Sequence, residues 1–299
     1  MNKTQPDFGR ILLAFAIIYL VWGSTYLANT WAVLVIPPFF LAGFRFVIAG
    51  ILMLGFSWLF GKVHFTWAQF KNASFAGLFL FAMGNGLVVW ALQHVDSGIA
   101  ALVVALEPLI VVLLMWEMKN DRPTWNSWLG LSLGIIGTIL LVGQPQFVSN
   151  FKWLTGVLAI FVAISSWGFI SIWMTTADLP KSLIQSAALQ MLTGGVMLFA
   201  LGWFNGEFTR LQPFTNKALV SLVYLIVFGS ILAFTAFNYL LTKVSPTLIA
   251  TSAYVNPVVA LFLGWWLNHE QISLQSIAAA SILLTGVVFI SMKKRSKGH

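Results

Sequence analysis

Two charged residues interrupt long apolar stretches of this 299-residue chain, and both are of types that do chemistry. Glu107 is the only charged residue in ALVVALEPLIVVLLMW, residues 101–116, and Arg45 interrupts AGFRFVIAG, residues 42–50. A charge at the centre of a bilayer costs about 2.5 kcal/mol or more on insertion scales. Three interpretations of Glu107 stay open: it exchanges protons, it binds the ammonium group of a solute, or it forms an ion pair with Arg45 that braces two helices.

The composition shows that these charges belong to a membrane protein. Hydrophobic residues make up 59% of the chain and charged residues only 8%, whereas a soluble domain carries roughly a quarter charged residues. A bilayer core needs about 20 apolar residues per helix. The sequence predicts an all-α integral membrane fold with ten spans, near residues 11–33, 38–60, 72–93, 97–116, 125–143, 153–175, 182–204, 217–241, 246–267 and 274–292.

The basic residues predict the orientation of these spans. If the N-terminus is inside, the inner segments hold 12 of the 16 Lys and Arg residues and the outer loops hold 3, with Arg45 inside a helix. The outer three are Lys152, Arg210 and Lys217. The positive-inside rule therefore places both termini in the cytoplasm, with membrane lipid as the surrounding partner.

The two halves of the chain resemble each other at constant offsets. A shift of 145 residues aligns Trp22 with Trp167, and a shift of 149 residues aligns Pro108 with Pro257. We divide the chain into residues 1–148 and 149–299, each with five helices. An odd number of helices turns the second repeat upside down relative to the first. Inverted repeats of this kind are the structural basis of alternating access, so transport is the leading interpretation.

The repeat supplies further candidates for a polar cavity. The mates of Glu107 and Arg45 are Asn256 and Gln190, so the first half has two charges where the second has two amides. A zwitterionic solute would present its carboxylate to Arg45 and its ammonium group to Glu107. The alternative is that Asn256 and Gln190 only cross-link helices by hydrogen bonds.

Aromatic residues, a glycine-flanked amide and two prolines complete the candidate set. Trp22 and Trp167 lie near mid-helix, where an indole ring lines a cavity or fills a gap between helices. Tyr254 stands opposite Ala105 in the repeat, and Asn85 lies between Gly84 and Gly86, which mark a packing contact or a hinge. Pro108 and Pro257 are hinge candidates, because each frees the carbonyl four residues earlier.

The sequence lacks the residues that several other function classes require. The chain has no cysteine, no phosphate-binding loop and no His, Cys or carboxylate spacing suited to a metal, so we expect no metal and no cofactor. Nothing in the sequence indicates a nucleic-acid partner. Catalytic polar groups at one level, as in a membrane-embedded enzyme, and the charge rings of a channel are likewise not evident.

The ordered motifs resemble a known family. VWGSTY, AGFRFVIAG, and SGIAALVVALEPLIVVLLMW leading to NDRPTW are similar to the drug/metabolite transporter superfamily, in its ten-helix branch of two EamA-type repeats. SPTLIATSAYVNPVVALFLGWWLNHEQIS repeats the third motif. The resemblance implies a bacterial inner-membrane secondary carrier, often an exporter of amino acids or related metabolites, with helices 1–4 and 6–9 around a central cavity. The usual Gly-Glu-Arg turn is replaced by Asn120-Asp121-Arg122 and by His269-Glu270-Gln271.

The predicted function is therefore secondary transport of a small amphipathic or aromatic metabolite by alternating access, with no enzymatic activity. Export follows from the resemblance alone, and proton coupling and facilitated diffusion both fit the residues. A multidrug, nucleoside or amine carrier is the alternative, and an enzyme or a channel is a more remote one. The predicted lining is Glu107, Arg45, Trp22, Trp167, Asn85, Gln190, Tyr254 and Asn256. The sequence leaves the oligomeric state open.

Overall fold

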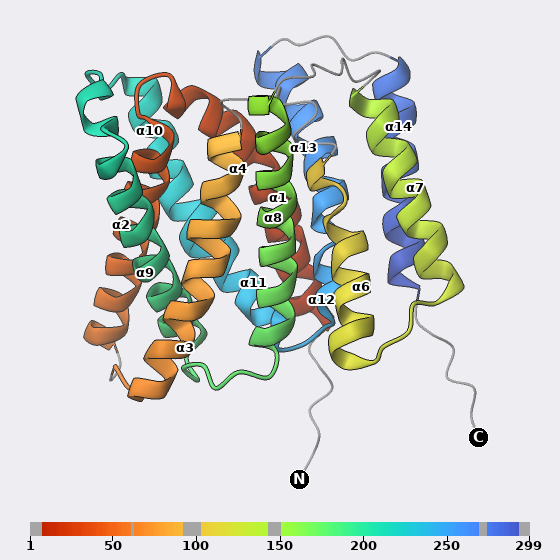
Figure 1. Ribbon diagram of the computed structural model, residues 1–299, viewed down its shortest axis with the longest axis horizontal. Coiled ribbons are helices and arrows are strands. Elements are labelled where there is room, and N and C mark those ends of the chain that lie inside the picture. The colour runs from red at the N-terminus through yellow and green to blue at the C-terminus, as the bar shows by residue number, and fades with distance from the viewer. Residues whose placement is uncertain (1–7, 61–62, 92–102, 143–150, 269–273, 293–299) are drawn as a thin grey trace.

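The computed structural model describes residues 8–60, 63–91, 103–142, 151–268 and 274–292, and within these every regular element is a helix (Figure 1). The first half contains α1 (Phe8–Val33), α2 (Pro38–Phe60), α3 (Trp67–Gly77), the π-helical segment η1 (Leu78–Asn85), α4 (Gly86–Ala91), α6 (Glu107–Lys119) and α7 (Trp125–Val142). The second contains α8 (Phe151–Met174), α9 (Leu183–Phe204), the 3₁₀ turn η2 (Glu207–Arg210), α10 (Asn216–Tyr224), the π-helical segment η3 (Leu225–Leu232), α11 (Ala233–Leu241), α12 (Pro246–Ile249), α13 (Ser252–Asn268) and α14 (Leu274–Ser291).

Six stretches of the described chain are long and apolar enough to cross a bilayer by themselves. They are Phe8–Val33, Pro38–Phe60, Trp67–Ala91, Leu154–Met174, Leu183–Phe204 and Asn216–Leu241. The third and sixth of these each combine two α-helices with the π-helical segment between them. The prediction of an all-α membrane fold is confirmed. The boundary at 148/149 stays a prediction, because residues 143–150 lie outside the described ranges.

Two predicted helices, 97–116 and 246–267, are not continuous. In the first, the Leu106 amide donates to the Val103 carbonyl at 3.1 Å in a tight turn, and α6 then begins at Glu107. Pro108 lies in the first turn of α6, where its missing N–H costs nothing. Pro108 therefore lies at the start of α6, next to this break, and its role as a hinge stays a prediction. The second helix is interrupted at residues 250–251, between α12 and α13, and Pro257 lies inside α13 as expected.

The helices of one half pack mainly against those of the other half. The predicted symmetry mates α2 and α9 lie along each other, and so do α7 and α14 at one edge of the molecule (Figure 1). The glycines aligned by the repeat, Gly50 and Gly195, both lie in the contact of α2 with α9. A Cβ at Gly50 would lie 2.9 Å from the Ala188 carbonyl oxygen, and one at Gly195 would lie 2.9 Å from Phe46 Cβ. Small residues are thus required where these helix backbones approach.

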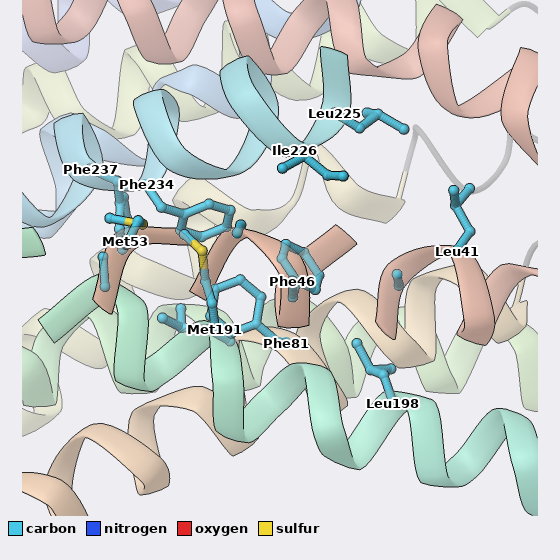
Figure 2. Close-up of a cluster of buried hydrophobic side chains, with 14 of the residues drawn as sticks. Leu41, Phe46, Met53, Phe81, Met191, Leu198, Leu225, Ile226, Phe234 and Phe237 are labelled. Atoms are coloured by element: carbon cyan, nitrogen blue, oxygen red, sulfur yellow. The ribbon is translucent and has the colours of Figure 1, made fainter. Parts of the chain in front are cut away.

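The core that results belongs to both halves. Figure 2 shows Phe46 and Phe81 of the first half beside Met191, Phe234 and Phe237 of the second. The rings of Phe46 and Phe81 are 4.3 Å apart, and those of Phe81 and Phe234 are 4.8 Å apart. Neither half encloses this cluster alone, so the packing of this core depends on both halves.

A carboxylate from the second half of the chain caps the N-terminus of α2. Glu207 follows Gly206, whose positive φ of 67° is a conformation that glycine adopts without strain. Its Oε2 accepts the Phe40 amide at 2.9 Å, and the side chain is only 4% exposed. Burial raises the pKa of Glu207, while the Phe39 and Phe40 amides and the charge of Arg210 oppose this shift in part. The first turn of α2 thus takes its cap from the second half.

Candidate functional site

A cavity of about 170 Å³ lies between the two halves. Its walls come from α1, η1, α4, the turn before α6, α6, α8 and α13. The lining residues are Trp22, Gly84, Asn85, Val88, Val104, Glu107, Ala163, Ile164, Trp167, Ser252, Ala253 and Asn256. Five of the eight residues that the sequence predicted are among them: Trp22, Asn85, Glu107, Trp167 and Asn256.

A second cavity, of about 10 Å³, adjoins the first on the side of α12. Val111, Ser171 and Pro246 line only this smaller cavity, whereas Val88 of α4 lines only the larger one. Four residues line both: Trp22, Glu107, Trp167 and Ser252. These four therefore form the boundary between a wide space and a narrow one.

The two tryptophans meet at this boundary, as their symmetric positions suggested. Their ring centroids are 5.8 Å apart and the planes are nearly perpendicular, at 81°. Phe234 and Phe237 of α11 pack against both indoles, with centroid distances between 5.3 and 5.9 Å. Edge-to-face contacts of this kind hold the rings in defined orientations. The tryptophans therefore supply a rigid aromatic wall.

Glu107 enters the cavity from a helix end. It is the first residue of α6, and the backbone amides of a first turn carry a partial positive charge that favours a carboxylate. Within the described residues no hydrogen bond or ion pair involves its side chain, which is partly accessible. The helix end at this break therefore stabilises the negative charge of Glu107, and the carboxylate oxygens stay available to a ligand.

Asn256 and Ser252 bring two polar side chains from α13. They are four residues apart and so share one helix face. The Asn256 side chain is 8% exposed, and its Oδ1 has no hydrogen-bond partner in the described part of the chain. Pro257 leaves the carbonyl of Ala253 without its helical donor, and Ala253 also lines the cavity. The second half therefore contributes acceptors to the cavity.

Asn85 lines the cavity beside glycines that make packing contacts. A Cβ at Gly84 would lie 3.1 Å from the Trp167 ring, and one at Gly86 would lie 2.8 Å from Leu198. The packing interpretation of these glycines therefore holds in this conformation. Asn85 is also the last residue of η1, and π-helical segments inside α-helices often occur at functional sites.

Arg45 does not line the cavity and does not pair with Glu107. Its Nε donates to Ser230 Oγ at 2.8 Å and its Nη2 donates to the Gly229 carbonyl at 3.1 Å, both in η3. The guanidinium also lies 4.7 Å from the centre of the Phe46 ring. The ion-pair interpretation of Glu107 therefore has no support in this conformation, because the Arg45 guanidinium donates to acceptors in η3.

Gln190 and Tyr254 also lie outside the lining. Gln190 is fully buried and donates to Ser186 Oγ at 3.0 Å and to Asn238 Oδ1 at 3.3 Å, so it cross-links α9 and α11. Tyr254 is fully buried too, packed with Ala105 and against Gly134, where a Cβ would overlap the phenol ring. Both residues stabilise contacts between helices in this conformation.

Some residues that line the cavities or pack against the tryptophans were not among the predictions. Ser252 had a usable signal, because it precedes Asn256 by one helical turn. Phe234 and Phe237, which hold the tryptophans, had none, because the chain has 26 phenylalanines. In the part of the chain that the structure describes, no group of three or more His, Cys, Asp or Glu residues could hold a metal ion.

Known proteins are similar to this chain over nearly its whole length. The sequence pattern described as the EamA-like transporter family matches residues 9–143 and, a second time, residues 154–292. The chain is 36% identical over 294 residues to the "Uncharacterized inner membrane transporter YedA" of Escherichia coli (strain K12), covering 98% of this chain and 93% of the relative. It is 25% identical over 281 residues to the "Uncharacterized transporter YoaV" of Bacillus subtilis (strain 168), covering 93% of this chain and 95% of that one.

A solved structure shares the fold. Described as "Crystal structure of protein", it superposes with a TM-score of 0.77 at 20% identity, and the match covers 94% of this chain and 96% of the other. At this level of identity the likeness concerns the fold alone.

Proposed function

Since this chain belongs to the EamA-like transporter family, a ten-helix membrane fold, and is a multi-pass inner-membrane transporter, we propose that it exports a small amphipathic or aromatic metabolite by alternating access. The observation that supports this proposal is the boundary of Trp22, Glu107, Trp167 and Ser252 between two cavities of unequal size. In an alternating-access carrier the wide and the narrow side exchange while the binding residues stay between them. With the N-terminus inside, the larger cavity faces outward.

The size of the cavity favours a small solute over a drug. Sites for drug-sized ligands usually measure roughly 300–1,000 Å³, and the larger cavity measures about 170 Å³. Among the described residues of the lining, Glu107 is the one carboxylate. In the proposed mechanism the Glu107 carboxylate binds either the transported solute or an exchanged proton.

Cysteine labelling tests the proposal, because the chain has no cysteine of its own. Val88→Cys reports the larger cavity and Val111→Cys the smaller one. In oriented vesicles, a membrane-impermeant maleimide should label the first only from the outside and the second only from the inside. A cross-link that holds the molecule in either conformation should abolish one of the two reactions.

The exposed loop residue His64 gives the matched control, because His64→Cys reports labelling that does not depend on either cavity. Labelling of Val88→Cys and Val111→Cys from both sides at once would indicate a continuous pore and would overturn alternating access. Labelling of neither from any side would show that no access pathway reaches the boundary.

A further inference from the structure

We propose that the cavity selects a small organic cation, an aromatic or aliphatic ammonium ion, and not a zwitterionic amino acid; this inference rests on the proposed function and names its substrate class. The polar groups of the lining carry the argument. Glu107 presents a carboxylate without a partner among the described residues, and Asn256 presents a buried Oδ1 that accepts no hydrogen bond there. Two acceptors without a partner suit a ligand that donates hydrogen bonds, and an ammonium group has three donors.

Among the described residues that line the cavity, no cationic side chain is available for a substrate carboxylate. None of the lining residues is Lys or Arg, and the guanidinium of Arg45 donates to η3. The N-terminus of α6 already carries the charge of Glu107, which would repel a second carboxylate there.

The remaining walls fit the apolar part of such a cation. Trp22 and Trp167 present two indole rings at nearly right angles beside Glu107. Indole faces attract cations that have been removed from water, and they also stack with aromatic groups. A carboxylate next to a tryptophan wall thus suits one positive charge on a short apolar arm. The cost of the buried carboxylate is offset when the ligand brings its counter-charge.

Three probes with the same phenyl ring and ethylene arm separate the possibilities: phenethylamine is a cation, phenylalanine a zwitterion and 3-phenylpropionate an anion. Their dissociation constants would be measured on the purified full-length protein in lipid nanodiscs. Phenethylamine should bind at least about tenfold more tightly than phenylalanine, a difference near 1.4 kcal/mol. Binding of 3-phenylpropionate should be weaker than that of both.

Three variants assign the preference to its residues. Glu107→Gln should remove the advantage of phenethylamine over phenylalanine, and Asn256→Leu should reduce it. Glu117→Gln, on the exposed face of the same helix, should leave it unchanged. Because the ranking of the three probes is measured on the wild type, the inference stays testable even if a variant fails to fold.

Equal or tighter binding of phenylalanine would overturn the cation assignment and return the zwitterion hypothesis. Failure of all three probes to bind would overturn it as well. In both cases, labelling of Val88→Cys only from the outside and of Val111→Cys only from the inside would still support the proposed carrier function. Labelling of both from both sides would contradict the carrier function but would not contradict the charge preference.

Discussion

Arg45 and Glu107 are both ionisable residues within the helices, but their surroundings differ. Arg45 is 6% exposed, and its guanidinium donates to Ser230 Oγ and to the Gly229 carbonyl of the opposite half. Glu107 lines both cavities and has no hydrogen-bond partner in the described residues. The first charge is bound to the protein on several sides, whereas the second faces space that a ligand can enter.

A structural charge and a functional charge differ in the partners that surround them. Both residues sit in apolar stretches, and both would be costly without compensation. Partners from the protein itself indicate a role in packing, because removing them leaves buried groups unsatisfied. A carboxylate held by a helix end and open to a cavity indicates a role in binding. The following variants test whether this division holds.

Arg45→Met should produce the largest loss of stability. The substitution keeps the length of the side chain but removes two hydrogen bonds from a charged donor, each worth about 1.5–3 kcal/mol. We expect the free energy of unfolding to fall by about 3 kcal/mol, measured as a lower melting temperature in detergent. Glu107→Gln should change it by less than about 1 kcal/mol, since that carboxylate has no partner to lose.

The exposed Arg122→Met is the control for loss of a positive charge. A rise in melting temperature for Arg45→Met would mean that desolvation of the guanidinium outweighs its hydrogen bonds. Arg45 would then be retained for function, and the division between the two charges would fail.

Ser230→Ala should have a smaller effect at the same contact. Ser230 accepts from Arg45 Nε and donates to the Leu225 carbonyl at 3.0 Å, so the variant leaves one buried donor and one acceptor unpaired. We expect a loss of about 1–2 kcal/mol. In a double-mutant cycle the losses for Ser230→Ala and Arg45→Met should be less than additive. Simple additivity would show that the bond contributes nothing to stability.

Glu207→Gln should have the smallest effect, visible only in its dependence on pH. The raised pKa of Glu207 means that the folded state holds this proton more tightly than the unfolded state. The stability from this group is therefore complete below the ordinary value of 4.5 and falls as the pH rises through the raised pKa. The slope cannot exceed about 1.4 kcal/mol per pH unit.

Melting temperatures between pH 4 and pH 8 should therefore decline more steeply for the wild type than for Glu207→Gln. Binding of phenethylamine should be the same in both, because Glu207 lies at the start of α2 and not in the cavity. An identical slope in both proteins would mean that another group dominates the titration.

Much of the fold was predictable because bilayer physics restricts it. Apolar length and loop charge predicted the spans, and the repeat predicted that Gly50 and Gly195 would occupy related places. The breaks at 105–106 and 250–251 could not be predicted from hydrophobicity, since apolar residues continue through the first of them. Pro108 carried a signal for it, because proline is common in the first turn of a helix, but the apolar run favoured the interpretation as a kink.

The site was predictable in part for a related reason. Glu107, Asn85 and Asn256 could be predicted because polar groups are rare in these apolar helices, and Trp22 and Trp167 because the repeat pairs them. Depth along a helix says nothing about the direction in which a side chain points. For that reason the sequence did not indicate that Arg45 would meet η3 or that Tyr254 would pack against Gly134.

The contact between Arg45 and η3 has a consequence for biosynthesis. Its two acceptors lie 184 and 185 residues further along the chain. At ribosomal rates of about 5–20 residues per second, roughly 10 to 40 s pass between the emergence of Arg45 and that of its acceptors. During this interval the first half lies in the bilayer with a guanidinium that has no native acceptor. Synthesis of η3, and not insertion of the first helices, is therefore the step that supplies the native acceptors of Arg45.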